Sequence, residues 1–325
     1  MKAILLKEFG PPENLYIGEY STPKPAPNEI LIKIAATALN RADTMQRKGN
    51  YPPPPGASPI LGLEMAGEIV GLGSAVTTWE IGDKVCGLLS GGGYAEYAVI
   101  HEDLAIPIPK DWTYEKAAAI PEVFLTAFQA LSWLAQLKKG ERLLIHAGAS
   151  GVGTAATQLA KAIGVSVMVT ASAGKHELCK SLGVEKAIDY KNEDFEKVVM
   201  DYTDGKGVDV IVDFIAAPYF QKNLNLLSTD GRLVMLSLIG GVKTEANLIP
   251  ILRKRLKIMG STLRARSLEY KRDLTKDLWH FAGPLFETQQ LKPVIDSVYD
   301  WNEVAEAHRY MEANKNQGKI ILKIN

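Results

Sequence analysis

The chain has 325 residues, of which 46% are hydrophobic and 23% are charged. This length favours about two domains, and the composition is that of a globular protein. Lys plus Arg and Asp plus Glu both number 37, so no strong electrostatic attraction to nucleic acid or to an anionic membrane is expected. Cys86 and Cys179 are too few for a disulfide framework or a Cys-rich zinc site.

The N-terminus carries no recognisable targeting signal. Its first eight residues combine a short apolar run with charges and lack the small-residue cleavage site of a secretion signal. No stretch approaches the roughly 20 apolar residues of a membrane-spanning helix. We therefore expect a cytoplasmic protein that does not enter the membrane.

The first 120 residues are predicted to be rich in β-strands. Short apolar runs at 30–34, 67–70 and 84–88 are bounded by Gly, Pro and Asp, as is typical of strands. From about residue 122 the pattern changes to strands alternating with helix-length segments. The strands are expected at 143–147, 165–170, 187–190, 208–214, 232–236 and 257–261.

Because these later strands are apolar on both faces and are joined by helices, they indicate a parallel sheet covered on both sides. About six such strands are typical of a doubly wound dinucleotide-binding fold. Residues 262–325 return to mixed elements and are expected to rejoin the first domain. The predicted class is α/β, with one domain formed by 1–121 and 262–325 and the other by 122–261.

A glycine-rich turn follows the first of these strands and opens a helix. It reads Gly148-Ala149-Ser150-Gly151-Val152-Gly153. Gly148 permits the tight turn, Gly153 permits close packing of helix on strand, and the helix N-terminus offers N–H groups to a pyrophosphate. Ser150 replaces the middle glycine of the strict fingerprint, but it is small and its hydroxyl can donate to phosphate. A turn without a nucleotide is the alternative, and we favour the cofactor.

The end of the second strand indicates which nicotinamide cofactor is used. NAD enzymes usually carry an acidic residue there, for the ribose 2′-hydroxyl. Here no carboxylate occurs before Glu177, whereas Lys175 can pair with a 2′-phosphate and Ser172 can donate to it. Tyr190, at the end of the third strand, can reach the same part of the site. NADPH is favoured, although Lys175 can also be an ordinary solvated lysine at a helix start.

Several motifs in order along the chain resemble the quinone oxidoreductase branch of the medium-chain dehydrogenase/reductase superfamily. The likeness is strongest to its NADPH-dependent, tumour-suppressor-inducible members, which are related to zeta-crystallin. It spans essentially the whole chain. The motifs are Asn40-Arg41-Ala42-Asp43, 47–52, 62–70, Ala119-Ile120-Pro121, Leu125-Thr126-Ala127, His146-Ala147-Gly148 and 310–315.

The resemblance implies a GroES-like β-rich catalytic domain, a Rossmann domain and a homodimer or homotetramer. It implies a zinc-independent NADPH:quinone oxidoreductase that passes hydride directly to a quinone or a small α,β-unsaturated carbonyl. By family precedent the site residues fall into three groups. Tyr51, Asn40 and Thr126 lie near the nicotinamide, Lys175, Ser172 and Tyr190 around the 2′-phosphate, and Ser237, Leu238, Ile239 and Lys319 along the cofactor.

Zinc is not expected, because the positions of two ligands of the zinc alcohol dehydrogenases hold Asn40 and Leu63. A catalytic zinc needs three protein ligands, and Leu63 cannot supply one. Without a metal to lower the pKa of its hydroxyl, a simple alcohol is a poor substrate. An electron-poor quinone or enone accepts hydride with less assistance. Tyr51 is the candidate donor to the acceptor oxygen, with Asn40 and Arg41 as rivals; alternatively, Tyr51 only packs its ring.

Two other functions remain open. One is an NADPH-dependent enoyl-thioester or alkenal reductase, in which Tyr51 donates the proton. The other is a non-enzymatic, cofactor-binding protein that is crystallin-like or associates with RNA, although neutral charge counts against strong RNA binding. Among the histidines, only His146 lies beside the glycine turn, and we expect it to be a hydrogen-bonded core imidazole.

Overall fold

A computed structural model describes residues 1–324 and divides the chain into two compact units. The first unit comprises Met1–Leu125 and Leu263–Asn325, and the second comprises Thr126–Thr262. The domain boundaries expected from the sequence, after residues 121 and 261, lie within a few residues of these divisions and remain a prediction.

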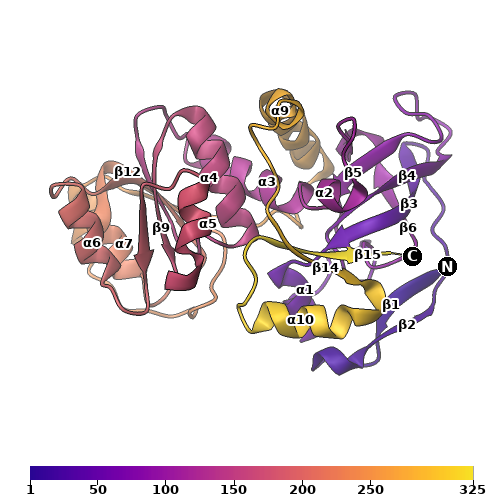
Figure 1. Cartoon of the computed structure of the whole chain (residues 1–325), viewed down its shortest axis with the longest axis horizontal. Coiled ribbons are helices and arrows are strands. Elements are labelled where there is room, and N and C mark those ends of the chain that lie inside the picture. Colours follow the sequence, from indigo (N-terminus) through magenta and orange to yellow (C-terminus); the bar gives the residue numbers. More distant parts are fainter. Residues whose placement is uncertain (325) are drawn as a thin grey trace. The chain divides into compact units, whose positions relative to one another are not determined.

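The first unit is built on a seven-stranded sheet in the order β14-β15-β3-β4-β5-β7, in which β6 also pairs with β3 (Figure 1). A separate antiparallel pair, β1-β2, precedes it. The strands are β1 (Lys2–Leu6), β2 (Leu15–Glu19), β3 (Glu29–Ala38), β4 (Glu64–Leu72), β5 (Lys84–Leu88), β6 (Tyr97–His101), β7 (Ala105–Pro107), β14 (Ile295–Asp300) and β15 (Lys319–Lys323). The helices are α1 (Arg41–Arg47), α2 (Tyr114–Ala118), α9 (Leu268–Glu287) and α10 (Val304–Glu312), with short 3-10 turns at Pro12–Asn14, Glu102–Leu104 and Trp301–Glu303.

Strand β3 shows why this sheet forms. Ile30, Ile32 and Ile34 alternate along it and are at most 3% exposed, because successive side chains of a strand point to opposite faces. On the neighbouring strand, Gly67 lies opposite Ile34, and a Cβ added to Gly67 would stand 2.1 Å from the carbonyl oxygen of Lys33. The close approach of β3 and β4 therefore requires glycine at this position.

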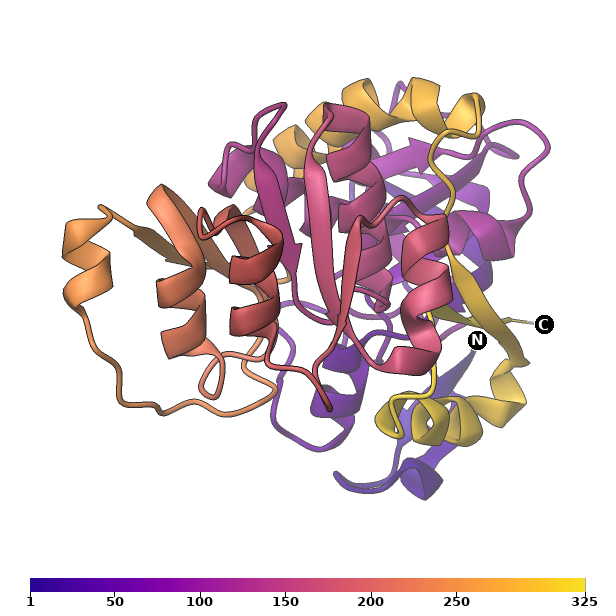
Figure 2. The same cartoon turned by 60° about the vertical axis from the view of Figure 1, so that its left-hand side comes forward.

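A buried arginine ties α1 to the N-terminal loop and to α10. Helices α1 and α10 lie side by side in Figures 1 and 2. Arg47 donates to the Gly10 carbonyl at 3.0 Å and to Glu312 at 2.7 Å, and its third contact is His308 Nδ1 at 3.2 Å. These three partners fix the C-terminal end of α1. The first turn of the same helix carries Asn40 as its N-cap.

The second unit contains a six-stranded, all-parallel sheet in the order β10-β9-β8-β11-β12-β13. Numbered within the unit this order is 3-2-1-4-5-6, which is that of the Rossmann fold. The strands are β8 (Arg142–Ile145), β9 (Ser166–Ala171), β10 (Lys186–Asp189), β11 (Val208–Asp213), β12 (Leu227–Met235) and β13 (Lys257–Gly260). The predicted combination of a β-rich unit and a doubly wound α/β unit is confirmed.

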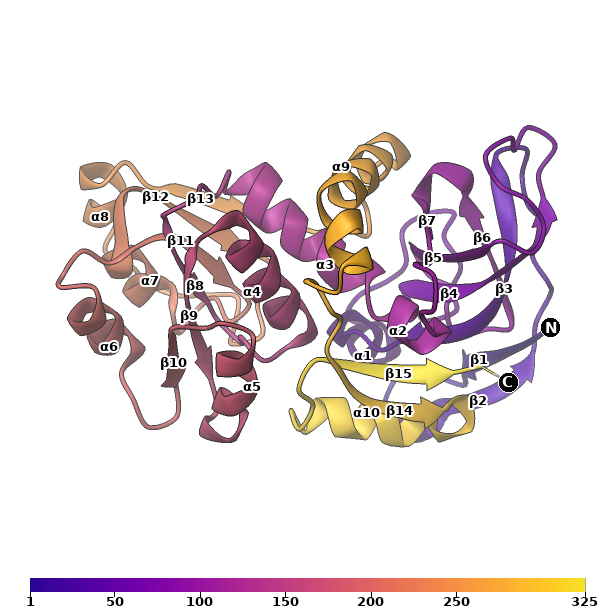
Figure 3. The same cartoon turned by 45° about the horizontal axis from the view of Figure 1, so that its top comes forward.

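Helices cover both faces of this parallel sheet. Helices α4 (Gly151–Ile163) and α5 (His176–Ser181) lie on one side of it, and α6 (Phe195–Tyr202) and α7 (Phe220–Leu226) lie on the other (Figure 3). Phe195 and Val199 of α6 pack in one buried cluster with Leu144 of β8. The unit also contains α8 (Ile249–Arg253) and the 3-10 turn Ala173–Lys175.

Helix α3 (Pro121–Phe128) contains the boundary between the units and continues as a π-helical segment, Gln129–Leu134. Together with α2 it forms a stretch, Tyr114–Leu134, that by length and composition alone is apolar enough to cross a membrane. Of its 18-residue apolar window, 72% is buried inside the structure, and core helices of soluble proteins meet the same criterion. The stretch is therefore weak evidence for a membrane span.

Candidate active site and cofactor cradle

The glycine turn forms the N-terminus of helix α4. Ser150 is the N-cap of α4, and its Oγ accepts a hydrogen bond from the Gly153 N–H at 3.0 Å. A hydroxyl that accepts in this way keeps its own hydrogen for donation. The first turn of α4 also holds Gly151 and Val152, and it combines unsatisfied N–H groups with the positive end of the helix dipole. This end of the helix suits a phosphate group.

The two outer glycines of the turn are required by packing. A Cβ added to Gly148 would lie 2.4 Å from the Cβ of Val169 on β9. A Cβ added to Gly153 would lie 2.5 Å from the carbonyl oxygen of Ala147. Both distances are too short for real side chains. At Gly148 the requirement comes from the close approach of β9, whereas the sequence indicated a tight turn there.

The other predicted cofactor residues of this unit lie at the same edge of the sheet. In the parallel pairs, Ile145 lies opposite Val169, and Ala171 opposite Asp189. The chain after β8, β9 and β10 therefore leaves the sheet at one edge, where it supplies the glycine turn, Ser172 and Tyr190. Lys175 ends the 3-10 turn that Ser172 caps, and Tyr190 is 44% exposed.

Strand β12 brings a further segment to this edge. Ser237, Leu238 and Ile239 lie shortly after its end at Met235, and the Ile239 N–H donates to the carbonyl of Phe214, which follows β11. Leu238 and Ile239 are 51% and 58% exposed. Ligands of open parallel sheets bind at the carboxyl ends of the strands, where the strand order reverses. Here that reversal lies between β8 and β11.

In the first unit, a buried ion pair organises a polar cluster. Lys319 Nζ lies 2.7 Å from Glu64 Oε1, and the two side chains are 3% and 0% exposed. The ammonium also donates to the side-chain oxygen of Asn40 at 2.7 Å and to the Leu39 carbonyl at 2.9 Å. The three hydrogens of the ammonium thus have three acceptors. Lys319 can therefore donate to a cofactor only if one of these hydrogen bonds breaks.

Asn40 is held by the same cluster. Its Nδ2 donates to Glu64 Oε1 at 2.8 Å, and its backbone N–H donates to Asp43 Oδ2 at 2.7 Å. Asp43 Oδ1 accepts from the Gly62 N–H at 3.1 Å. Burial raises the pKa of Asp43 to about 6, although these two backbone donors lower it.

Leu63 and its neighbour Glu64 are buried in the first unit. Leu63 is 2% exposed and lies next to Glu64, whose second oxygen accepts from the Glu122 N–H at 2.9 Å. Within residues 1–324, no group of three or more His, Cys, Asp or Glu is placed to hold a metal ion. Asp43 and Glu64 are instead engaged in hydrogen bonds and an ion pair.

Tyr51 lies against an arginine that sequence reasoning missed. The Arg264 guanidinium carbon is 5.3 Å from the centroid of the Tyr51 ring, and its Nη1 donates to the Tyr51 carbonyl at 3.4 Å. Arg264 Nε donates to the Ser90 carbonyl at 2.9 Å. Arg264 is 5% exposed, and its Nη2 is buried without a hydrogen-bond partner among residues 1–324.

Two more ionisable groups that the sequence analysis did not identify, Glu122 and Lys271, influence Tyr51 and Arg264. Glu122, in the first turn of α3, is partly buried, and burial followed by the charge of Glu64 raises its pKa to about 8. Burial followed by the charge of Glu122 raises the pKa of Tyr51. Lys271 Nζ donates to Ser90 Oγ at 2.8 Å and to the Arg264 carbonyl at 2.7 Å. Lys271 thereby fixes the segment that carries Arg264.

Two remaining residues of the sequence analysis lie in the second unit. Thr126 is partly buried on α3, and its place beside a nicotinamide stays a prediction. His146 is fully buried, with Nδ1 3.0 Å from Thr170 Oγ1 and Nε2 2.8 Å from Asn223 Oδ1. The expectation of a hydrogen-bonded core imidazole is confirmed, and burial lowers its pKa.

Comparison with known proteins agrees with this architecture. Residues 26–110 match the alcohol dehydrogenase GroES-like domain, and residues 151–279 match the family described as zinc-binding dehydrogenase. The quinone oxidoreductase of Rattus norvegicus is 32% identical over 330 residues, which cover 99% of this chain and 97% of that protein. A polyketide synthase of Mycobacterium tuberculosis, described as putative and inactive, is 34% identical over 298 residues, but the chain spans only 18% of its length.

Solved structures extend the likeness. The quinone oxidoreductase of Coxiella burnetii has a TM-score of 0.85 at 32% identity, and CurK enoyl reductase has 0.90 at 29%; each likeness covers 100% of this chain and 99% of the other. A mycobacterial protein solved with NADPH has a TM-score of 0.87 at 29% identity over 99% of this chain and all of that one. A GroES-like unit joined to a Rossmann sheet defines the medium-chain dehydrogenase/reductase superfamily. Within it, the chain belongs to the quinone oxidoreductase family.

Proposed function

We propose that the protein is a zinc-independent, NADPH-dependent oxidoreductase that reduces a quinone or a small α,β-unsaturated carbonyl. The observation that carries the proposal is the buried Nη2 of Arg264, which has no partner among residues 1–324 and belongs to a guanidinium that lies against Tyr51. A buried donor without an acceptor costs about 1–3 kcal/mol. An acceptor oxygen that gains negative charge would pair with it.

The residues at the carboxyl edge of the parallel sheet fit a dinucleotide. Its pyrophosphate would sit at the N-terminus of α4, between Ser150 and Gly153, and its 2′-phosphate near Ser172, Lys175 and Tyr190. The backbone of 237–239 would run beside it. NADPH, once bound, supplies the hydride. The chain's own residues supply binding, orientation and stabilisation of charge.

The polar cluster of the first unit supplies the groups that meet the reduced acceptor. The Tyr51 hydroxyl and Arg264 Nη2 are the donors proposed for the oxygen that becomes negative. Glu122, with a pKa of about 8, holds a proton at neutral pH and is the proposed source of the proton that this oxygen takes up. Lys319 neutralises Glu64 and thereby holds the Asn40 amide in place.

The same proposal covers the partners. The substrate is a small molecule, and we place the protein in the cytoplasm. For assembly we propose a homodimer, or a homotetramer built from it, since β13 is an edge strand and exposed apolar side chains lie just before it. Val242, Leu248 and Leu252 are 75%, 60% and 82% exposed. Apolar side chains exposed to this extent would become buried if a second copy of the chain covered them.

One other function has a specific observation in its favour. The likeness to CurK enoyl reductase supports reduction of an enoyl thioester, with Tyr51 or Glu122 as the proton donor. The two functions differ in the acceptor and share the cofactor.

The test is a panel of quinones, alkenals and enoyl thioesters, each followed by oxidation of NADPH and of NADH. The proposal expects the highest kcat/KM for NADPH with a quinone or a small enone. If only enoyl thioesters are turned over, the second function replaces the first. If no nicotinamide is oxidised or bound, both are wrong.

A further inference from the structure

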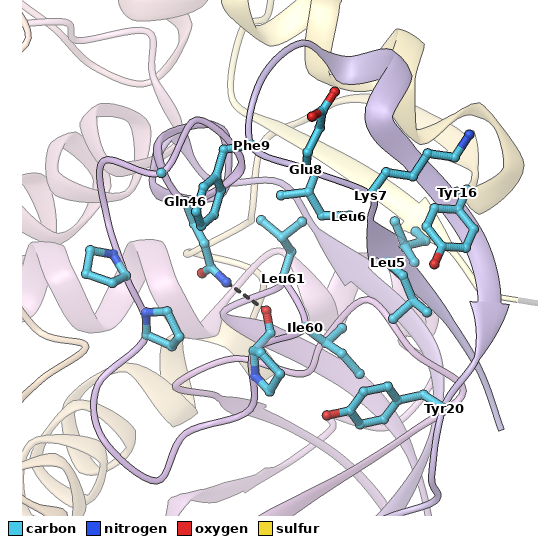
Figure 4. A pocket seen from close by; sticks show the side chains of 15 residues that line it. Leu5, Leu6, Lys7, Glu8, Phe9, Tyr16, Tyr20, Gln46, Ile60 and Leu61 are labelled. Carbon is cyan, nitrogen blue, oxygen red and sulfur yellow. Dashed lines mark hydrogen bonds between the residues drawn. The ribbon is translucent and has the colours of Figure 1, made fainter.

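We infer that a groove on the first unit binds a small aromatic molecule carrying a hydroxyl or amide hydrogen-bond donor, at a site that does not include Tyr51 or Arg264. The groove has a volume of about 680 Å³ and lies between the β1-β2 pair, the C-terminal end of α1 and the loop that leads to β4 (Figure 4). Its lining is mainly apolar and includes Leu5, Phe9, Tyr20, Pro52, Ile60 and Leu61.

A single amide gives the groove a polar anchor. Gln46 lines it and is 6% exposed. Its Nε2 donates to the carbonyl of Pro59 at 2.9 Å, as Figure 4 shows. Its Oε1 is buried without a hydrogen-bond partner among residues 1–324.

The orientation of this amide is determined by its contacts. Turning the Gln46 amide over would set Oε1 against the Pro59 carbonyl oxygen, and two acceptors cannot share a hydrogen bond. Oε1 therefore stays an acceptor that needs a donor. A ligand N–H or O–H would satisfy it, whereas a carbonyl or an ether oxygen would not.

The aromatic side chains around the groove indicate the shape of the ligand. Phe9 is 69% exposed, Tyr16 41% and Tyr20 38%, and all three line the groove. Aromatic rings prefer offset-stacked or edge-to-face contacts with other rings. Pockets of roughly 300–1,000 Å³ with apolar walls and one or two placed polar groups are typical small-molecule sites. A flat ring with one donor, such as a phenol, fits both features.

A phenol and a quinone differ in whether they carry a hydrogen-bond donor for Gln46 Oε1. A hydroquinone carries O–H donors, whereas a quinone carries only acceptors. The groove is therefore expected to prefer the reduced molecule. The link to a reaction product rests on the proposed function; the binding of phenols does not.

The experiment measures binding of 2-naphthol and of 2-fluoronaphthalene, which has the same rings but no donor, by isothermal titration or ligand-observed NMR. The wild-type protein should bind 2-naphthol about tenfold more tightly than it binds 2-fluoronaphthalene. The variant Gln46→Leu should lose this preference and keep its turnover with a quinone. Phe9→Ala, at an exposed position, should weaken the binding of both probes and leave the ratio of the two affinities unchanged.

Three results would overturn the inference. They are equal affinities of the wild-type protein for the two probes, an unchanged preference in Gln46→Leu, and loss of 2-naphthol binding in Arg264→Leu, which would move the site to the Tyr51 corner. The wild-type comparison decides the matter even if Gln46→Leu fails to fold. Because binding is measured without turnover, failure of this inference is distinct from failure of the proposed enzymatic activity.

Discussion

Lys319 and Glu64, 255 residues apart in the sequence, form a buried ion pair of 2.7 Å beside Asn40. The pair joins β15 to β4, and Lys319 also reaches the end of the segment that leads into α1. The ammonium gives Glu64 a fixed positive partner within the chain. This contact supports the proposal that the site works through hydrogen bonds and fixed charges.

Removal of Lys319 should destabilise the protein. In Lys319→Met, Glu64 stays buried without its cation, and breaking one partner of a buried pair costs about 3–5 kcal/mol. Urea denaturation measures the free energy of unfolding. The double variant Lys319→Met/Glu64→Gln should recover most of the loss, and a single-variant loss below about 1 kcal/mol would contradict the account.

Arg264 should contribute to turnover more than to binding of the cofactor. Loss of one preformed donor to a developing negative charge costs about 10²–10³-fold in kcat. We expect Arg264→Leu to lose that much with a quinone and Arg264→Lys to recover only part of it, because an ammonium lacks the planar fork. Steady-state kinetics checks this, with an unchanged KM for NADPH as the control. A kcat within threefold of wild type would remove Arg264 from the site.

Tyr51→Phe distinguishes the role of the hydroxyl from that of the ring, because it removes only the hydroxyl. If the hydroxyl stabilises charge in the transition state, turnover with quinones falls roughly tenfold or more. The ring keeps its contact with Arg264 in this variant, so the structure should not change. Unchanged turnover would assign Tyr51 to shape alone.

The raised pKa of Glu122 has a defined effect on stability. The unfolded carboxyl ionises near pH 4.5, whereas the folded one keeps its proton until about pH 8. The folded state therefore binds more protons over this interval, and its free energy of unfolding falls as pH rises from about 4.5 to 8. Since Glu122 is only partly buried, we expect roughly 2 kcal/mol over that range.

Denaturation at several pH values checks this effect. Glu122→Gln should remove this part of the slope and be the more stable protein above pH 8, while Glu177→Gln, whose side chain is 91% exposed, should behave as wild type. Turnover of the wild-type protein should also decline above about pH 8, where Glu122 has lost its proton. Identical slopes for Glu122→Gln and wild type would refute the assignment.

Cofactor choice is tested at Lys175. Loss of its charge should raise the KM for NADPH far more than the KM for NADH, because only NADPH carries the 2′-phosphate. Lys175→Ala is compared with Lys180→Ala, an exposed lysine on the following helix. Equal changes for the two cofactors would exclude Lys175 from phosphate binding.

Sequence reasoning succeeded where the signal is local. The apolar strands around the turn from Gly148 to Gly153 lie within one stretch of chain, and strand, turn and helix follow one another in the structure. It missed Arg264 and Glu122, because their setting depends on distant segments. Arg264 meets Ser90 across 174 positions, and the backbone of Glu122 meets Glu64 across 58. Neither residue belongs to a motif, and only folding reveals the unpaired guanidinium nitrogen or the raised pKa.

The most direct test of the account follows the oxidation of NADPH by a quinone after exhaustive chelation, together with the metal content of the purified protein. We expect turnover that is unchanged by chelation and a primary isotope effect when the transferred hydrogen of NADPH is deuterium. Turnover that chelation abolishes and stoichiometric zinc restores would contradict it.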